Sequence, residues 1–324
     1  MVDVARAAGV STASVSRALS NPESVSEDIR GRVVQAAAIL GYVRNGAGRA
    51  LASLRTGVVG VVLPSLADGV HEQVLAALEE RLRSSGYSVA VSVAAISCSL
   101  DATQKLMSTG VDAVASIGAG QAPECRGLAE RRRTPWIRII DDAEASDPDS
   151  LGIDLMRGGL TVARYLHELG HRRFALLSSP ADAAPLVAAA GRGLQRALAT
   201  LPNASVVECV VTGFDAASQA ADRLMRQASP PTAIVCSDTE TAAGAAKGCE
   251  DAGIAVPEQV SVIGVGDPAW ARRWRPPLTV VRLPLAAAGR AAAERLLGRL
   301  THQHAEIPTA AARLIVRGSS GPAR

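Results

Sequence analysis

From Val58 onward the sequence alternates short apolar runs with amphipathic stretches of helical length, and no other feature restricts the fold as much. Two of the helical stretches lie around Val70–Arg83 and Met156–Leu169. The apolar runs are expected to be strands: Val58–Leu63, Ser88–Val93, Asp112–Ile117, Trp136–Ile140, Arg173–Leu177, Val206–Val211, Ala233–Cys236 and Val260–Val265. Strands that are apolar on both faces and separated by helices indicate parallel βαβ units. We therefore predict an α/β fold for this part of the chain.

The first 45 residues have a different pattern, that of short helices joined by tight turns. The first helix has an apolar stripe of Val4, Ala5 and Ala8 and is expected to end at Gly9. Ser11 can cap a second helix by accepting from a free amide of its first turn, and Val15 and Leu19 would face inward on that helix. A third helix is expected to begin at Ser26 and end at Gly41, with the inward positions Ile29, Val33, Ala37 and Leu40.

The excess of positive charge is confined to this N-terminal segment. Residues 1–57 contain seven arginines, no lysine and four acidic residues, whereas the remaining residues contain 27 basic and 27 acidic side chains. Such asymmetry favours a polyanionic partner for the N-terminal segment alone. A net charge of three is weak support for a polyanionic partner by itself, so the argument also needs the pattern of side chains in this segment.

Two short helices separated by a glycine turn are typical of the helix-turn-helix motif. With Val15 and Leu19 turned inward, the outer face of the second helix holds Ser11, Thr12, Ala13, Ser16 and Arg17. Residues at the start of such a helix reach base edges in the major groove, and Arg17 can donate two hydrogen bonds to one guanine, worth roughly 1–3 kcal/mol of discrimination. Ser11, Ser14 and Ser26 are better placed for phosphates. The alternative is a small helical bundle that contacts another protein.

Several classes of function lack their sequence signals. No run of about 18 apolar residues predicts a membrane span, and no signal peptide is recognised, so we expect a cytoplasmic protein. The five cysteines have no C-x-x-C spacing, which favours reduced thiols over disulfides or zinc. The Gly-x-Gly pairs at 118/120 and 264/266 do not complete a dinucleotide fingerprint. We find no catalytic motif and therefore expect no cofactor, no metal and no enzymatic activity.

The N-terminal run closely resembles the DNA-binding segment of the lactose-repressor (LacI-type) family. The matching segments are DVARAAGVS at residues 3–11, SVSRAL at 14–19, Val25-Ser26 and Leu40-Gly41-Tyr42. Further motifs of the family are LGHRR at 169–173, VP at 256–257 followed by VSVIG at 260–264, and PPLTVVR at 276–282. The resemblance thus extends over nearly the whole chain. It implies a homodimer that binds a pseudo-palindromic operator and regulates transcription, with repression as the expected outcome.

The resemblance also implies a hinge helix after the DNA-binding segment, which orders on DNA and inserts a leucine into the minor groove. The segment NGAGRALA at 45–52 occupies that place, with Leu51 at the inserted position and Asn45 and Arg49 as further DNA contacts. Two glycines would keep the isolated helix unstable, and an inserted leucine unstacks a base step. Alternatively, Leu51 is a linker residue that packs on the rest of the chain.

For the rest of the chain, the resemblance implies a two-lobed domain like periplasmic binding proteins, with a small-molecule effector between the lobes. We expect a helix-turn-helix domain at 1–45, a hinge at 46–57 and an effector-binding and dimerisation domain at 58–324. Its first lobe would comprise about 58–150 and 284–308, and its second about 151–283 and 309–324. The tentative ligand-binding residues are His71, Asp141, Asp154, Asp238, Asp267 and Trp270.

This expected pocket departs from the pattern of the family. The position of the family's ligand-binding arginine falls near Ala190. The first of the family's two adjacent acidic residues is replaced by Gly266, and the family's aromatic pair is replaced by the residues around His71. Sugar pockets use carboxylates, arginine and aromatic rings. We therefore expect an effector other than an ordinary pentose or hexose, or none. An enzyme and a secreted solute-binding protein are the rival functions, and weak, salt-sensitive binding to operator-like DNA would favour either of them. His171 is expected to have a structural role and Trp136 to fill the core.

Overall fold

The computed structural model describes residues 1–42, 55–66, 69–118, 122–140, 149–153, 155–180, 185–301, 303 and 311–324. The chain divides into two compact units, Met1–Thr56 and Gly57–Arg324. In the described part of the chain, no helix has both the length and the apolar character that a membrane span requires. All five cysteines are free thiols, as the sequence predicted.

The N-terminal unit is a group of three helices around a small aliphatic core. Its helices are α1 (Val2–Ala8), α2 (Thr12–Ser20) and α3 (Glu27–Ile39), with a short 3-10 turn, η1 (Pro22–Ser24), before α3. The core contains the predicted Val4, Ala5, Ala8, Val15 and Val33, and also Ala18 and Ala36. The inward position predicted for Leu40 is wrong, because its side chain is 48% exposed. Leu40 is the residue at which α3 ends, and Tyr42 packs against the core instead.

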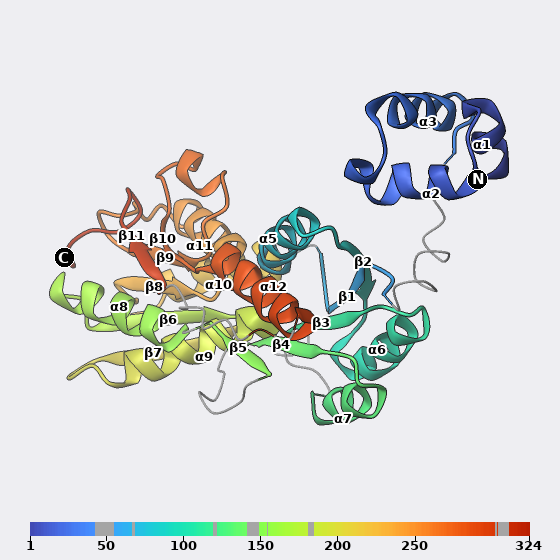
Figure 1. Cartoon of the computed structure of the whole chain (residues 1–324). Helices are drawn as coiled ribbons and strands as arrows, with labels where there is room; N and C mark the ends of the chain where they lie inside the picture. Colours follow the sequence, from blue (N-terminus) through green and yellow to red (C-terminus); the bar gives the residue numbers. More distant parts are fainter. Residues whose placement is uncertain are drawn as a thin grey trace. The chain divides into compact units, whose positions relative to one another are not determined.

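The second unit contains two sheets flanked by helices (Figure 1). The first sheet has the order β2-β1-β3-β4-β5, and all four pairings are parallel. Its strands are β1 (Val58–Leu63), β2 (Ser88–Val93), β3 (Ala113–Ile117), β4 (Trp136–Ile140) and β5 (Ser150–Gly152). The neighbouring helices are α5 (Val70–Ser84), α6 (Ser99–Ser108), α7 (Ala122–Arg132) and α12 (Leu285–Thr301), with a short turn η2 (Ile96–Cys98).

The second sheet has the order β11-β10-β9-β8-β6-β7. Its strands are β6 (Arg173–Ser178), β7 (Ser205–Val210), β8 (Ala233–Cys236), β9 (Ser261–Val265), β10 (Thr279–Arg282) and β11 (Arg313–Ile315). Its helices are α8 (Leu155–Glu168), α9 (Pro185–Ala199), α10 (Gly213–Met225) and α11 (Thr239–Asp251), with a short turn η3 (Ala271–Arg273). The pairing of β10 with β11 is antiparallel, and neither of these two strands was among those predicted from the sequence.

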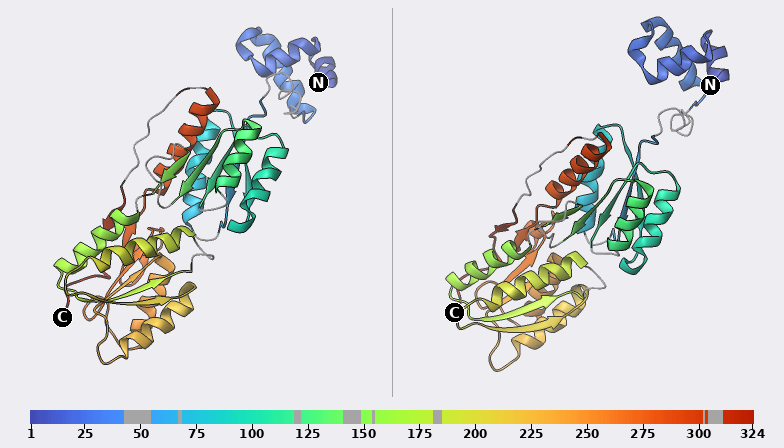
Figure 2. Two further views of the ribbon diagram at one scale, coloured as in Figure 1. Left: turned by 90° about the horizontal axis from the view of Figure 1, so that it is seen from below. Right: turned by 60° about the horizontal axis from the view of Figure 1, so that its bottom comes forward.

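Each predicted strand is present, and its ends lie within one residue of the expected ones. The reason is visible in the packing, because successive residues of a strand belong to cores on opposite faces of the sheet. Along β6, Phe174 and Leu176 lie in one core with α8 and α9, whereas Ala175 and Leu177 lie in the other with α10 and α11. Figure 2 shows helices on both faces of each sheet. Covering both faces explains why the strands read as uninterrupted apolar runs.

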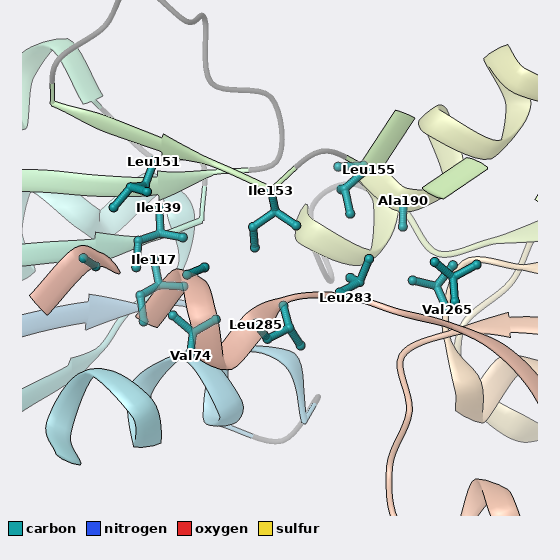
Figure 3. Close-up of a cluster of buried hydrophobic side chains, with 14 of the residues drawn as sticks. Val74, Ile117, Ile139, Leu151, Ile153, Leu155, Ala190, Val265, Leu283 and Leu285 are labelled. Carbon is teal, nitrogen blue, oxygen red and sulfur yellow. The ribbon is translucent and has the colours of Figure 1, made fainter. Parts of the chain in front are cut away.

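The two sheets share one continuous core, which runs through the segments that join them. Ile153 lies between β5 and α8, and Leu155 is the first residue of α8. Leu283 lies between β10 and α12, and Leu285 is the first residue of α12. Figure 3 shows these side chains between the cores of the two sheets. Because the linking segments are themselves buried, the lobes are joined by packed structure and not by a loose tether.

Candidate nucleic-acid interface and effector pocket

The second helix of the N-terminal unit begins as the sequence predicted. Gly9 ends α1 with φ of 64°, a left-handed conformation that glycine adopts without strain. Ser11 caps α2, since its hydroxyl oxygen accepts a hydrogen bond from the backbone N–H of Ser14 at 3.1 Å. The tight turn and the cap together fix where α2 starts and which face it presents.

The predicted DNA-reading face of α2 is accessible. The side chains of Ser11, Thr12, Ala13 and Arg17 are exposed, and those of Ser14 and Ser16 are half-buried. Val15, on the opposite side of the helix, is fully buried. Ser26 is exposed ahead of α3, and its hydroxyl makes no capping hydrogen bond. The structure therefore presents one continuous row of small polar residues and an arginine to solvent.

The arginines of the N-terminal unit fall into two groups. Arg6 pairs with Asp3 at 3.5 Å, and Arg32 pairs with Asp28 at 3.1 Å while donating to the carbonyl of Ala8. In contrast, no carboxylate among the described residues pairs with Arg17, whose Nε lies 3.5 Å from the carbonyl oxygen of Ala13. That distance is at the outer limit of a hydrogen bond. The Arg17 guanidinium is thus available to a ligand.

Five of the predicted site residues lie outside the described residues. They are the DNA contacts Asn45, Arg49 and Leu51 and the ligand contacts Asp141 and Asp154. Their assignments stay predictions from the sequence.

Asp238, predicted to bind a ligand, caps a helix in the structure. Its carboxylate accepts hydrogen bonds from the backbone N–H and the hydroxyl of Thr241, at 2.7 and 2.6 Å, and from the hydroxyl of Ser179 at 3.3 Å. The sequence carried a signal for this role, because aspartate is one of the residues preferred at the position before a helix. The observed contacts are those of the N-terminus of α11.

His71 and Trp270 lie in contrasting environments. His71 is fully buried on α5, and a Cβ placed on Gly118 would be 3.7 Å from its Nε2. Trp270 is 41% exposed, and its ring packs edge-on against Trp274 at a centroid distance of 6.0 Å. Neither residue lines the cavity that contains Asp267.

Asp267 lies at the wall of a cavity of about 540 Å³. Its carboxylate accepts hydrogen bonds from Arg282 at 2.9 Å and from Arg317 at 2.7 Å. Burial alone would raise the pKa of Asp267, but the hydrogen bonds and charges of Arg317 and Arg282 outweigh it and hold the pKa below its ordinary value. This acid is therefore ionised and engaged at neutral pH.

The cavity also contains arginines that sequence reasoning missed as a group. Its lining includes Arg272, Arg282, Arg290, Arg313 and Arg317. They come from η3, the end of β10, α12, β11 and the segment after β11, so nothing in their sequence spacing pointed to a common site. Only the fold brings these five guanidinium groups together.

The departures from the family pattern have local physical reasons. Gly266 has φ of 97°, and a Cβ there would lie 3.0 Å from the hydroxyl of Thr239, which donates to the carbonyl of Val265. An acidic side chain at this position would therefore be strained. Ala190 is buried in the core of the second sheet, where a guanidinium would have no room.

His171 has the structural surroundings that we expected. It is buried, with Nε2 donating to the carbonyl of Gly321 at 2.9 Å and Nδ1 lying 3.0 Å from the hydroxyl of Thr232. Burial lowers the pKa of His171, and the charge of Arg172 adds to this effect against the opposing hydrogen bond to Gly321. Trp136 fills the core beside α6 and α7, as predicted. Over the described residues, no group of three or more potential metal ligands occurs.

Known proteins resemble both units. A family model described as bacterial regulatory proteins, lacI family, matches residues 1–45, and a periplasmic binding protein-like domain matches residues 163–320. The HTH-type transcriptional regulator GntR of Pseudomonas aeruginosa is 30% identical over 299 residues, covering 91% of this chain and 87% of the relative. The HTH-type transcriptional repressor CytR of Escherichia coli K12 is 29% identical over 328 residues, covering 99% and 96%.

The solved structures include a lac repressor dimer bound to operator and the anti-inducer ONPF. Its TM-score with this chain is 0.81 at 25% sequence identity, and the match covers 98% of this chain and 97% of that one. The likeness therefore extends through the N-terminal unit as well as the two-sheet unit.

Proposed function

Because this chain belongs to the LacI family of bacterial regulatory proteins, we propose that it is a sequence-specific DNA-binding transcription regulator that represses promoters by occupying operator DNA. The observation that carries the proposal is the capped helix α2, which presents Thr12, Ala13 and Arg17 to solvent. A short helix with small side chains and one available guanidinium can enter the major groove. The relatives are transcription regulators, and we propose no enzymatic activity for this chain.

We propose that the domains are the helix-turn-helix unit at 1–45, the hinge at 46–57 and the effector-binding body at 58–324. The protein would act in the cytoplasm as a homodimer on a pseudo-palindromic operator, since the similar lac repressor structure is a dimer on operator DNA. Asn45 and the hinge residues Arg49 and Leu51 would contact the operator centre between the two helix-turn-helix units.

Ser11, Ser14 and Ser26 would contact phosphates, whereas Thr12, Ala13, Ser16 and Arg17 would face bases. Of the expected ligand residues, Asp267 lies in the pocket, where its carboxylate pairs with Arg282 and Arg317 and holds them at the wall. Asp141 and Asp154 stay predictions from the sequence. His71, Asp238 and Trp270 are weaker candidates, because their described contacts are those of packing and capping.

The proposal is tested by selecting bound fragments from genomic DNA at physiological salt and comparing the selected duplex with a random one. We expect Arg17→Ala to reduce the ratio of specific to random affinity by about 5- to 150-fold, the equivalent of a guanine contact of roughly 1–3 kcal/mol. The matched control is Arg6→Ala, which removes the same charge from α1, where Arg6 pairs with Asp3.

The control should lower affinity for both duplexes by a similar small factor, because it alters only the general electrostatic attraction. Equal affinity of the unaltered protein for selected and random duplexes would refute the proposed function. Equal discrimination by the Arg17 variant and the unaltered protein would remove Arg17 from base recognition while leaving the function standing.

A further inference from the structure

The cavity at Asp267 has an unusual charge for its size. Five arginines and one carboxylate line it, a balance of four positive charges among the described residues. No aromatic ring belongs to this lining. A pocket for neutral sugars has the opposite character, with acceptors for hydroxyl groups and rings for stacking.

Only part of this positive charge is neutralised within the chain. Asp267 engages Arg282 and Arg317, and its side chain is 8% exposed. The other three arginines, Arg272, Arg290 and Arg313, are exposed, and within the described ranges no ion pair holds them. Like charges around one cavity repel each other, so an anion between them lowers the free energy of the arrangement.

We propose that this cavity binds the effector, and that the effector is a small organic anion with at least two negative charges on oxygen atoms. Guanidinium groups bind phosphate and carboxylate oxygens through paired hydrogen bonds, which gives both affinity and orientation. A volume of about 540 Å³ suits a metabolite-sized ligand. The inference rests on the proposed function, because it names the class of molecule that regulates DNA binding.

The position of the arginines assigns the anion a regulatory role. Arg290 lies on α12, which packs against the first sheet, whereas Arg313 lies on β11 of the second sheet. The cavity also includes residues 282–287, where the chain passes from one sheet to the other. An anion held by Arg290 and Arg313 together would therefore contact both lobes at the segment that joins them.

The test uses the full-length protein at constant ionic strength, with calorimetric titration and thermal unfolding as readouts. The probes are glucose 6-phosphate, citrate and glucose, so that a phosphate ester, a polycarboxylate and a neutral analogue are compared. We expect at least one of the two anions to bind and to raise the melting temperature, while glucose does neither. The anion that binds more tightly identifies phosphate or carboxylate as the recognised group.

The variant Arg290→Gln with Arg313→Gln should lose about tenfold or more in affinity for each arginine removed. Both side chains are exposed, so the variant should fold. The control is Arg131→Gln with Arg132→Gln on α7, which removes the same charge from an exposed helix end outside the cavity. The control should bind the anion as tightly as the unaltered protein.

Equal responses to glucose and to both anions, or equal weakening by the two double variants, would overturn the proposal. So would a change in dimer assembly or in anion-free DNA affinity that is specific to the cavity variant, since the arginines would then serve a partner subunit or DNA. Operator selection is measured on the same samples. Anion binding without operator selection would refute the proposed function alone, and selection without anion binding would refute this inference alone.

Discussion

Replacing Asp267 by asparagine removes one charge from the centre of the arginine group and leaves the size of the side chain nearly unchanged. In the folded protein, the carboxylate accepts from Arg317 at 2.7 Å and from Arg282 at 2.9 Å. An asparagine can accept from one guanidinium, but its amide donors then face the other. Asp267→Asn should therefore destabilise the second unit.

The size of the effect follows from the exposure of the two partners. The side chain of Arg317 is 14% exposed, and a hydrogen bond between charged groups in such a setting contributes about 1.5–3 kcal/mol. The side chain of Arg282 is 56% exposed, so solvent screening limits its pair to about 1 kcal/mol or less. Together these give a loss of about 1.5–4 kcal/mol, or roughly 3–16 °C in melting temperature for a unit of this length.

The assay is denaturant unfolding followed by tryptophan fluorescence. All three tryptophans, Trp136, Trp270 and Trp274, lie in the second unit, so the signal reports this unit without interference from the N-terminal helices. A double-mutant cycle with Arg317→Gln isolates the energy of that pair from the general effect of each substitution. A coupling energy below about 0.5 kcal/mol would refute the assignment of the Asp267–Arg317 pair as a stabilising contact.

The difference in stability between Asp267→Asn and the unaltered protein should depend on pH with a defined sign. Because the pKa of Asp267 is lowered in the folded protein, its ionised form stabilises the fold above the ordinary value of 3.8. That contribution is lost as the pH falls below this value towards the folded pKa. The variant and the unaltered protein should thus converge in stability at acidic pH. At neutral pH, the variant should bind the anionic probe more tightly, because the cavity then carries five uncompensated positive charges.

Three further predictions concern packing, titration and capping. Gly289→Ala should destabilise the second unit by about 1–3 kcal/mol in the same unfolding assay, because its Cβ would lie 2.2 Å from the carbonyl oxygen of Val74. The control is Gly127→Ala on α7 of the same unit, whose Cβ would meet only the end of the flexible Arg131 side chain at 3.3 Å and should cost no stability. Equal losses in the two variants would show that α5 and α12 do not approach as described. Lowering the pH below the ordinary histidine pKa of 6.5 should destabilise the second unit by up to about 1.4 kcal/mol per pH unit, because His171 takes up a proton in the unfolded chain at a higher pH than in the folded one. If His171→Asn leaves the slope of stability against pH unchanged, His171 is not the group responsible. Ser11→Ala should lower the free energy of unfolding of the N-terminal unit by about 1 kcal/mol, because it removes the cap of α2. Circular dichroism of the helices measures this loss, and unchanged stability would mean that the cap contributes nothing.

The strands and the helices of the N-terminal unit could be predicted from the sequence because their signals are local. Strands such as β1 and β6 are covered on both faces, so the residues between their ends form an apolar run that can be recognised. The start of α2 is specified within six residues by Gly9, Ser11 and Ser14. The short strands β5 and β11, of three residues each, have too little length for such a pattern and were not predicted. The four-residue strand β10 was not predicted either.

The pocket could not be predicted in the same way. Its arginines occupy positions from 272 to 317 on different elements, and each one alone resembles an ordinary surface residue. Asp238 was expected in the pocket because of its position in the family, yet its carboxylate is committed to the N-terminus of α11. Leu40 kept helical spacing but fell where the helix ends. Contacts between distant segments decide the first case, whereas the local geometry of a helix start and of a helix end decides the other two.

The placement of the arginine-lined cavity leads to a quantitative prediction about how an anion regulates operator binding. A ligand shifts an equilibrium between two arrangements of the lobes only by the ratio of its affinities for them, and a tenfold ratio corresponds to about 1.4 kcal/mol. If an anion between Arg290 and Arg313 changes operator affinity by some factor, then operator DNA must change anion affinity by the same factor. Titrating the anion into the free protein and into its operator complex measures this factor, and titrating operator with and without the anion measures it a second time. A factor that Arg290→Gln with Arg313→Gln leaves unchanged would mean that the anion acts on operator binding by ionic competition at the DNA and not through the lobes.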